Sequence, residues 1–571
     1  MATSTLVLGL DVGNTAGCVG VLRSGGVEVV TNEQGSRTTP AVIAFSEAET
    51  LIGESAVGQL TRNAANTVVD GLRLLGRDFD DEAFQSELAK WRFQVSRGKD
   101  GKAPQVDVHI KGEAKSLAPP RLLSHLLARL RADADAFTGE TVKEAALVVP
   151  AHFDTAQRAA LKEAAQIGGV RVKMVLPAPL CVAVLYAHEH SLAVAARDAA
   201  AGAPPPRAQQ LLVVDVGGSS TEASVVEMSI AASADGDGAE SAPASGAASV
   251  TCEQLCVRAS VHAHGVGAAS VDAALMQHVL KEIRRRQRVD LSDNSRAKAR
   301  LLAACHAAKH SLSSAAQAQV TTEADGADYF ANVSRATLEE LSQPVAKDTA
   351  SLAMRALSAA GLEPEQVDAL LLAGGGCRMA RVAAALTALC PHAPVHFGAI
   401  SEEAACRGAA LAGGMIKSVA KADSSEVSNV LVTRPRLPRA LGVRTADGSV
   451  VVLAPCRAPV PLTRTLRFGC AAGTSALLLA LVEMAPPEDG AIDVSDAPPA
   501  AVARPADAAT AHTVATLAVR DVPAGCEALL VRLCVEASGS VELSCEAAMA
   551  ADGDDGDAEA MPRQVLAKMR V

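Results

Sequence analysis

The sequence predicts an α/β domain over residues 1–418 and a small β domain over residues 435–548. Three observations predict this fold class. In the first part, apolar strand patterns alternate with helical patterns, as in a sheet that helices cover. A strand–turn–strand segment with the turn sequence Asp-Val-Gly occurs twice. From Pro435 onward, short alternating runs between turns replace the long helical patterns, which is typical of a β domain.

The composition is that of a packed globular protein. The chain has 571 residues, of which 49% are hydrophobic and 20% charged. Only 2% are aromatic, which argues against binding single-stranded nucleic acid by base stacking. The net charge of −11 argues against general affinity for nucleic acid but leaves room for a local basic patch. We therefore expect no direct DNA binding.

The cysteines and the N-terminus indicate in which cellular compartment the protein lies. The thirteen cysteines are scattered, without a Cys-x-x-Cys pair. Cys252, Cys256, His262 and His264 cluster in sequence, but their spacing matches no common zinc pattern. The start MATSTLVLGLDVG lacks a basic region, and no apolar stretch approaches the roughly 20 residues of a spanning helix. We expect a cytosolic (cytoplasmic) protein with no membrane contact.

The first repeated segment runs from residue 7 to residue 22 and predicts two strands joined by a tight turn. Asp11 ends the first strand, and Gly13 permits the turn. Backbone N–H groups together with Asn14 and Thr15 could hold phosphate oxygens, and Asp11 could order the water molecules around Mg²⁺. A plain hairpin is the alternative for such a segment alone.

The second repeated segment, residues 211–228, favours the phosphate-binding interpretation because it repeats the same pattern. The residues that correspond to Asp11, Gly13, Asn14 and Thr15 are Asp215, Gly217, Gly218 and Ser219. Ser220 follows in the same turn.

The other elements of the α/β part follow in chain order. We expect strands at 27–45, 145–149 and 170–175, an edge hairpin at 91–111, and helices at 66–77, 122–137, 154–168, 180–186, 271–289, 296–314 and 402–415. Asp154 and Gln157 form a capping box at the start of one helix. A loop is expected at 188–210, a disordered low-complexity insert at 231–249 and an acidic tail at 549–571.

Two further segments have open interpretations. The ends of the helices around residues 284–300 are basic and could contact an acidic partner or RNA, although a solvated helix face is the favoured interpretation. Residues 370–381 predict a strand, a glycine turn and a helix start. Three glycines there would let a ligand approach the backbone, or simply form a tight turn.

The chain resembles the 70-kilodalton heat-shock chaperones (heat shock protein 70). The matching stretches occur in the family's order: GLDVGNTAGCVGV, NEQGSRTTPAVIAF, NTVVDGLRLLGRDFDD, VVPAHFDTAQRAALKEAAQIGGV, VVDVGGSSTEASVV, AAKHSLSS, ANVSRATLEEL and LLLAGGGCRMARV. The resemblance implies a two-lobed actin-like ATPase domain with duplicated ribonuclease-H-like cores at 1–418, a linker at 419–434, and a truncated β-sandwich domain at 435–548. It implies ATP/ADP and Mg²⁺ as cofactors.

The resemblance assigns roles to individual residues. The metal would be held through Asp11 and Asp215. Gly374 and Gly375 would pack along the nucleotide, and Arg378 and Glu402 would lie near the adenine. The nucleotide-binding set that the resemblance implies is Gly13, Asn14, Thr15, Gly217, Gly218, Ser219, Ser220, Lys309, Ser313, Gly374, Gly375, Arg378 and Glu402.

Departures from the family's pattern fall on the hydrolysis machinery. Leu72 stands at the position of the catalytic lysine, which would neutralise charge and orient water in phosphoryl transfer. Ala178 stands at the position of the glutamate that arranges the metal-bound water. The adenosine-binding Glu and Arg are His306 and His310. We therefore assign no catalytic residue.

These departures, a reduced linker and the absence of a helical lid resemble the short, lidless members of the ribosome-associated complex. That resemblance implies a J-domain co-chaperone, the ribosome, a second heat shock protein 70 and, weakly, nascent or unfolded polypeptide as partners, and poor or absent ATP hydrolysis. The alternative is an active chaperone in which Arg73 or Lys173 replaces the lysine. A sugar kinase or actin relative and a large heat-shock-type exchange factor are less favoured alternatives.

Overall fold

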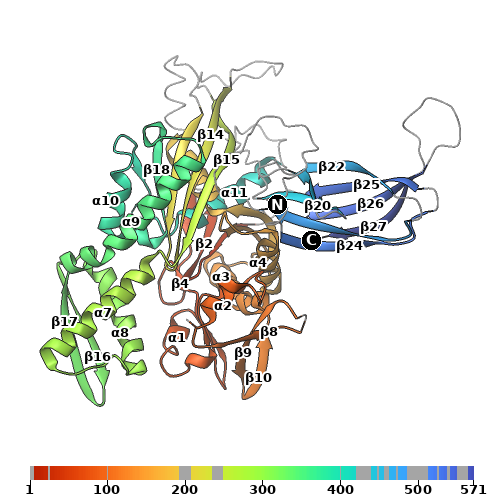
Figure 1. The fold of residues 1–571 in the computed structure, drawn as a ribbon. Helices are drawn as coiled ribbons and strands as arrows, with labels where there is room; N and C mark the ends of the chain where they lie inside the picture. Colours follow the sequence, from red (N-terminus) through yellow and green to blue (C-terminus); the bar gives the residue numbers. More distant parts are fainter. Residues whose placement is uncertain are drawn as a thin grey trace. The chain divides into compact units, whose positions relative to one another are not determined.

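The computed structural model describes most of the chain in two compact units (Figure 1). One unit is residues 1–151 with 160–433, and the other is residues 152–159 with 434–571. The residues described are 6–23, 26–89, 91–99, 101–191, 208–233, 249–398, 400–419, 439–445, 449–454, 462–470, 474–484, 512–523, 526–535, 541–549 and 563–570. The expected insert, linker and tail lie mostly outside these residues. Among the described helices, none is long and apolar enough to cross a membrane.

The first unit contains a mixed sheet built around β1. Its strand order is β12-β11-β1-β2-β3, and β4 also pairs with β2. β1 runs antiparallel to β2 and parallel to β11. The strands are β1 (Val7–Val12), β2 (Ala16–Arg23), β3 (Gly26–Val29), β4 (Thr39–Pro40), β11 (Glu144–Val149) and β12 (Arg171–Pro177).

A second sheet in the same unit has the same strand order, built around β13. It runs β15-β14-β13-β18-β19, with β13 antiparallel to β14 and parallel to β18. The strands are β13 (Gln209–Val216), β14 (Ser220–Ser233), β15 (Ser249–His264), β18 (Ala369–Ala373) and β19 (Val395–His396). Each of the two Asp-Val-Gly segments therefore forms the central hairpin of its own sheet.

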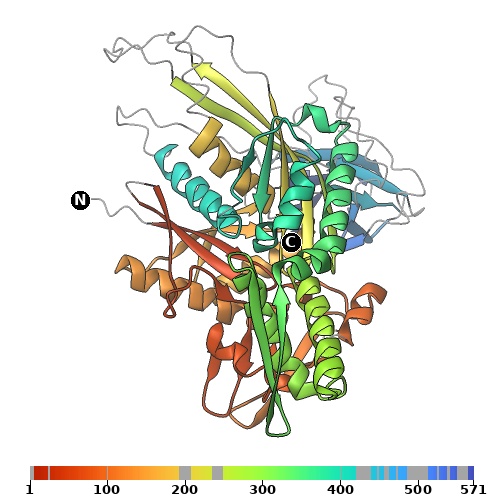
Figure 2. The same cartoon turned by 90° about the vertical axis from the view of Figure 1, so that its left-hand side faces the viewer.

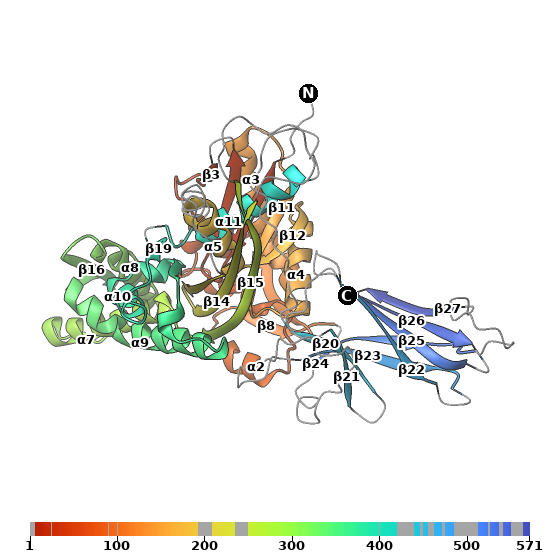
Figure 3. The same ribbon diagram turned by 90° about the horizontal axis from the view of Figure 1, so that it is seen from above.

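Two helices pack between these sheets. A single buried core combines residues of β11 and β12, of β13 and β18, and of helices α5 (Ala178–Tyr186) and α11 (Ala404–Val419). Figure 3 shows α5 and α11 side by side at this position. Gly9 is required there, because a Cβ on it would lie 2.2 Å from the backbone oxygen of Cys406 in α11. The two central hairpins are thus held on one common core.

Further helices cover the outer faces of the sheets. α3 (Pro119–Thr138) covers the first sheet and ends at Gly139, which has a left-handed φ of 76°, as the sequence predicts. α4 (Thr155–Ile167) begins with the predicted reciprocal bonds of Asp154 and Gln157, at 2.8 and 3.1 Å. The outer face of the second sheet is covered by α9 (Arg335–Ala359), which shares one buried core with α7 (Ala268–Gln287), α8 (Ser295–Leu312) and α10 (Ala380–Thr387). The π-helix η3 (Ala187–Ser191) follows α5.

Small peripheral elements complete this unit. They are β5 (Ile43–Phe45), β6 (Thr50–Ile52), α1 (Glu54–Val57), η1 (Ala64–Asn66), β7 (Thr67–Val68), η2 (Gly71–Leu74), α2 (Glu82–Leu88), β8 (Gln94–Arg97), β9 (Pro104–Ile110), β10 (Glu113–Leu117), β16 (Gln317–Ala324), β17 (Ala327–Ser334), η4 (Pro364–Gln366) and η5 (Gly375–Arg378). The helix expected at 66–77 is wrong. Asp70 adopts a left-handed φ of 53°, which interrupts any α-helix, so the segment forms a two-residue strand and a 3₁₀ turn.

The second unit is built from two four-stranded antiparallel sheets. Their orders are β21-β20-β23-β24 and β22-β25-β26-β27, and one buried core contains residues from both. The strands are β20 (Ala440–Arg444), β21 (Val450–Ala454), β22 (Leu462–Gly469), β23 (Leu477–Met484), β24 (His512–Val519), β25 (Cys526–Val535), β26 (Val541–Met549) and β27 (Arg563–Arg570). β27 lies in the segment expected to be an acidic tail and pairs with β26.

Candidate functional site

The two central hairpins have the same turn geometry. In the first, the Gly13 N–H donates to the Ala16 carbonyl at 2.9 Å. In the second, the Gly217 N–H donates to the Ser220 carbonyl, also at 2.9 Å. Both turns follow directly on the aspartate-bearing strand.

The turns meet face to face. A Cβ on Gly218 would lie 2.2 Å from the Cγ2 of Thr15, so the backbone of the second turn rests on the side chain of the first. Gly374, at the end of β18, has a φ of 75°, and a Cβ there would lie 2.3 Å from the Oδ1 of Asp215. Glycine is required at these two points, because a Cβ would collide with the Thr15 side chain at Gly218 and with Asp215 and the Val216 backbone at Gly374. The sequence-predicted glycines and hairpins therefore come together around Asp215.

Two half-buried carboxylates, Asp11 and Asp215, lie in this site. Burial raises the pKa of Asp11 to about 6. Burial, the negative charge of Asp11 and the negative charge of Glu222 raise the pKa of Asp215 to about 7. Such shifts show that the ionised carboxylates lack a compensating positive charge. A hard cation with oxygen ligands, such as Mg²⁺, would supply that charge, so this donor set fits it.

Unsatisfied polar atoms also surround the turns. In the described part of the chain, Asn14 Oδ1, Ser219 Oγ and Ser401 Oγ are buried and lack a hydrogen-bond partner. Ser401 adjoins Gly374, because its carbonyl accepts from the Gly374 N–H at 2.8 Å. Buried polar groups are normally paired, so three of them around one site indicate a missing polar ligand. Two hydroxyl donors beside a carboxylate pair fit a phosphate-bearing ligand with its cation.

The start of α7 is bound to the second turn. The Ala268 and Ala269 N–H groups donate to the carbonyls of Gly217 and Gly218 at 3.0 and 2.8 Å. One turn further on, the buried carboxylate of Asp272 accepts from the Lys309 ammonium at 2.8 Å. Lys309 is itself buried, so its charge is neutralised within the protein.

Two histidines lie next to this pair. The Nδ1 of His306 lies 3.0 Å from the same Asp272 oxygen that Lys309 contacts. The rings of His306 and His310 lie 4.8 Å apart, centroid to centroid. Burial and the nearby charges of His306, Lys309 and Arg378 lower the pKa of His310. Arg378 is therefore close enough to His310 to influence its charge.

Arg378 and Glu402 form a charged pair near His310. They are joined by an ion pair of 2.9 Å, and Gly375 packs near the Glu402 carboxylate. Ser313, in contrast, donates its hydroxyl to the carbonyl of His310. The structure thus brings Lys309, Arg378 and Glu402 into the site region and commits the Ser313 hydroxyl to the backbone.

Neither Arg73 nor Lys173, the two candidate replacements for the family's catalytic lysine, has a free side chain. Leu72 is 3% exposed. Arg73 makes an ion pair of 2.5 Å with Glu87, and both side chains are nearly buried. Lys173 lies 3.3 Å from Glu144, which pairs in register with Val7 at the start of β1. Since Asp11 lies four residues further along β1, Lys173 is about 13 Å from it along the strand.

Glu222 is a site residue that the sequence analysis missed. It is 9% exposed and lies directly opposite Asp215 in the β13–β14 ladder. Its carboxylate accepts from the Ser260 hydroxyl and the Ala151 N–H, both at 3.1 Å. Ala178 lines a small gap together with Asp215 and Glu222. The signal in the sequence was the second acidic residue of the hairpin, seven positions after Asp215.

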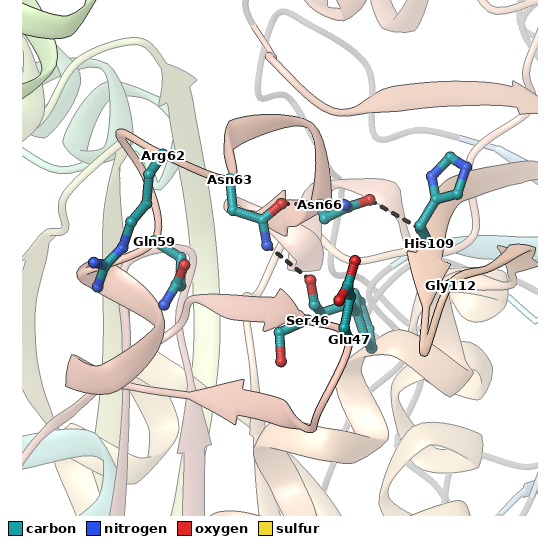
Figure 4. A pocket seen from close by; sticks show the side chains of 9 residues that line it. Ser46, Glu47, Gln59, Arg62, Asn63, Asn66, His109 and Gly112 are labelled. Atoms are coloured by element: carbon teal, nitrogen blue, oxygen red, sulfur yellow. Dashed lines mark hydrogen bonds between the residues drawn. The ribbon is translucent and has the colours of Figure 1, made fainter.

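One cavity of the described structure lies away from this site. It measures about 550 Å³ and opens between the end of β5, the η1 turn and the β9–β10 turn (Figure 4). No predicted site residue lines it. Its side-chain amides are already bonded, since Asn63 donates to the Phe45 carbonyl and Asn66 donates to Asn63.

The Cys/His group also forms no single metal site. Cys252, Cys256, His262 and His264 all lie on β15. A strand advances about 3.3 Å per residue, which puts Cys256 and His262 roughly 20 Å apart. These two residues cannot bind one ion.

Comparison with known proteins gives one family. A family model described as "Hsp70 protein" matches residues 7–234 and 248–476. Heat shock cognate 70 kDa protein 3 of Dictyostelium discoideum is 29% identical over 463 residues, 81% of this chain and 68% of that protein. Heat shock 70 kDa protein BIP3 of Oryza sativa is 32% identical over 466 residues, 81% of this chain and 64% of that protein. The human putative heat shock 70 kDa protein 7 is 33% identical over 376 residues, 66% of this chain and 92% of that protein. The chain spans about two thirds of the length of most of these relatives.

Proposed function

The chain belongs to the Hsp70 family, and we propose that it is an ATP-binding chaperone or co-chaperone that hydrolyses ATP slowly or not at all. The observation that carries this proposal is the state of the two hydrolysis positions. Leu72 is a buried aliphatic residue where the resemblance places the lysine, and its neighbour Arg73 is held by Glu87. Ala178 presents a methyl group where the resemblance places a carboxylate.

The binding half of the site is retained. Asp11 and Asp215 would hold Mg²⁺ through its water shell, and the turns at Gly13 and Gly217 would hold the phosphates. Bound Mg²⁺ would neutralise phosphate charge. We propose that the two sheets with one strand order are duplicated lobes that enclose the nucleotide. Arg378, Glu402 and His310 would contact the nucleoside, with Lys309 kept in position by Asp272.

The missing half is the machinery for phosphoryl transfer. Hydrolysis needs a cation that stabilises charge developing on the transferred group and a base or carboxylate that orients the attacking water. Within the described residues, Arg73 is paired with Glu87 and Lys173 with Glu144. The chain's own groups therefore support holding a nucleotide more than cleaving it.

The partners are proposed from the resemblance. Hsp70 proteins generally work with J-domain co-chaperones and unfolded polypeptides. We propose a stable J-domain partner, action at the ribosome on nascent chains together with a second heat shock protein 70, and location in the cytosol.

Two measurements test the enzymatic part. Calorimetry should detect ATP and ADP binding that depends on Mg²⁺, and single-turnover assays should show hydrolysis close to the rate without protein. Turnover at the rate of ordinary family members, abolished by Asp11→Ala, would overturn the proposal and favour an active chaperone. Arg73→Met and Lys173→Met then identify the cation responsible.

Affinity purification from cytosol tests the partners. Recovery of a J-domain protein with ribosomal subunits is expected. Recovery of unfolded client proteins alone would contradict the partner proposal.

A further inference from the structure

We propose that a basic tip of the first unit binds single-stranded RNA. We call this surface the α7–β17 tip and define it as residues 281–300 and 317–334, which comprise the end of α7, the start of α8 and the β16–β17 hairpin. Figures 1 and 2 both show the hairpin lying along these helices. The proposal is independent of nucleotide binding at the hairpin turns.

The helical part of the tip is strongly positive. Residues 281–300 contain eight Lys and Arg and three Asp and Glu, a net charge of +5 in a chain of net charge −11. The side chains of Arg284, Arg285 and Arg286 are 73%, 66% and 61% exposed. An exposed excess of guanidinium groups attracts the phosphate backbone of a nucleic acid.

Local ion pairs leave much of this charge uncompensated. The single carboxylate of Glu282 accepts from both Arg285 and Arg286, at 2.9 and 2.8 Å. Arg284 contacts Asp290 at 3.2 Å. Across the described ranges, no carboxylate lies within salt-bridge distance of three further cations, Arg288, Arg296 and Lys298.

The hairpin presents an aromatic ring next to these cations. Phe330 is 48% exposed on the outer face of β17, opposite Thr321 of β16. The next pair on that face is Gln319 and Asn332. The Gln287 amide at the end of α7 donates to the Phe330 carbonyl at 2.6 Å, which holds the ribbon beside the arginines.

The low aromatic content argues against base stacking over most of the chain, but Phe330 supplies one exposed ring beside exposed cations, and this combination favours RNA over an acidic protein. An exposed ring stacks on unpaired bases, and neighbouring amides and hydroxyls can bond to base edges, whereas an acidic peptide needs only the cations. Arginines near a helix C-terminus are also favoured by the helix dipole, which explains their position but not the exposed ring. Glu323, Asp325 and Asp328 make the end of the hairpin acidic. Because these carboxylates repel phosphates, the bound RNA would follow the α7 side of the tip.

Fluorescence anisotropy with the full chain and a labelled, unstructured 20-nucleotide RNA tests the proposal. Contact with about four phosphates predicts a roughly 50-fold loss of affinity between 50 and 200 mM salt. The variant Arg284→Glu/Arg286→Glu/Arg288→Glu should lose at least tenfold in affinity. The matched control Lys99→Glu/Lys111→Glu/Lys115→Glu changes the net charge equally at exposed lysines elsewhere and should bind like the wild type.

Phe330→Ala separates the two partner classes. It should lower RNA affinity about tenfold with the salt dependence unchanged, because stacking is not electrostatic. Thermal unfolding of every variant verifies that the fold is kept. Absence of RNA binding, an equal loss in the lysine control, or a Glu-rich 20-residue peptide that binds as tightly as RNA and ignores Phe330→Ala would each overturn the proposal. The last result would assign the tip to an acidic protein partner.

Discussion

Replacing Asp215 by Asn should stabilise the nucleotide-free protein while it abolishes Mg²⁺-dependent nucleotide binding. Asp215 is half-buried beside Asp11 and Glu222, and these surroundings raise its pKa from 3.8 to about 7. An acid with a raised pKa in the folded state binds more protons when folded than when unfolded. The free energy of unfolding therefore loses nothing to Asp215 below pH 3.8, and it falls as the pH rises toward 7.

The magnitude follows from the shift. Each pKa unit corresponds to about 1.4 kcal/mol, so ionising Asp215 in the folded state costs up to about 4 kcal/mol at pH 8. At pH 5, which is just over one pH unit above the unfolded pKa, the same cost is only between about 1 and 2 kcal/mol. A neutral amide of the same shape removes this cost. The variant should thus gain about 3 kcal/mol more at pH 8 than at pH 5.

Denaturant unfolding of the nucleotide-binding unit at both pH values, without nucleotide, measures this difference. Mg²⁺ with ATP should raise the unfolding midpoint of the wild type but not of Asp215→Asn. An Asp215→Asn protein that is less stable at pH 8, or equally stabilised at both pH values, would refute the reasoning. Either result would mean that Asp215 already has a compensating partner in the folded protein.

Two further predictions concern packing around the site. Gly374→Ala should lower the unfolding free energy by more than 2 kcal/mol and abolish ADP binding in calorimetry, because the new Cβ would collide with Asp215. The control is Gly361→Ala, whose φ is +67° with open space around it. This variant should cost only about 1 kcal/mol of backbone strain. Lys309→Met should cost about 3 kcal/mol in denaturant unfolding at pH 7.5, since it leaves the Asp272 carboxylate buried without its ammonium partner. A cost below 1 kcal/mol for Lys309→Met, or equal costs for the two glycine variants, would contradict these expectations.

The local elements were predictable because local chemistry sets them. The helix end at Gly139 and the capping box of Asp154 and Gln157 depend on neighbours in sequence, and the structure has both. The segment 66–77 was mispredicted because its apolar spacing resembles that of a helix. Only the structure shows that the left-handed Asp70 and the pairing of β7 with β5 replace the helix there.

The sequence by itself determined that two Asp-Val-Gly hairpins exist and that Leu72 and Ala178 lack charge, since residue identity alone decides which chemistry a side chain can perform. Tertiary structure alone decided that the two turns touch through Gly218 and Thr15. It also decided that the charge of Glu222 raises the pKa of Asp215, and that Arg73 and Lys173 form ion pairs with carboxylates. The first of these relations joins residues from the two sheets that pack on α5 and α11, so it depends on how the sheets pack. Pattern along the chain gives the parts of a site, whereas packing sets the distances and burial on which its pKa values and binding depend.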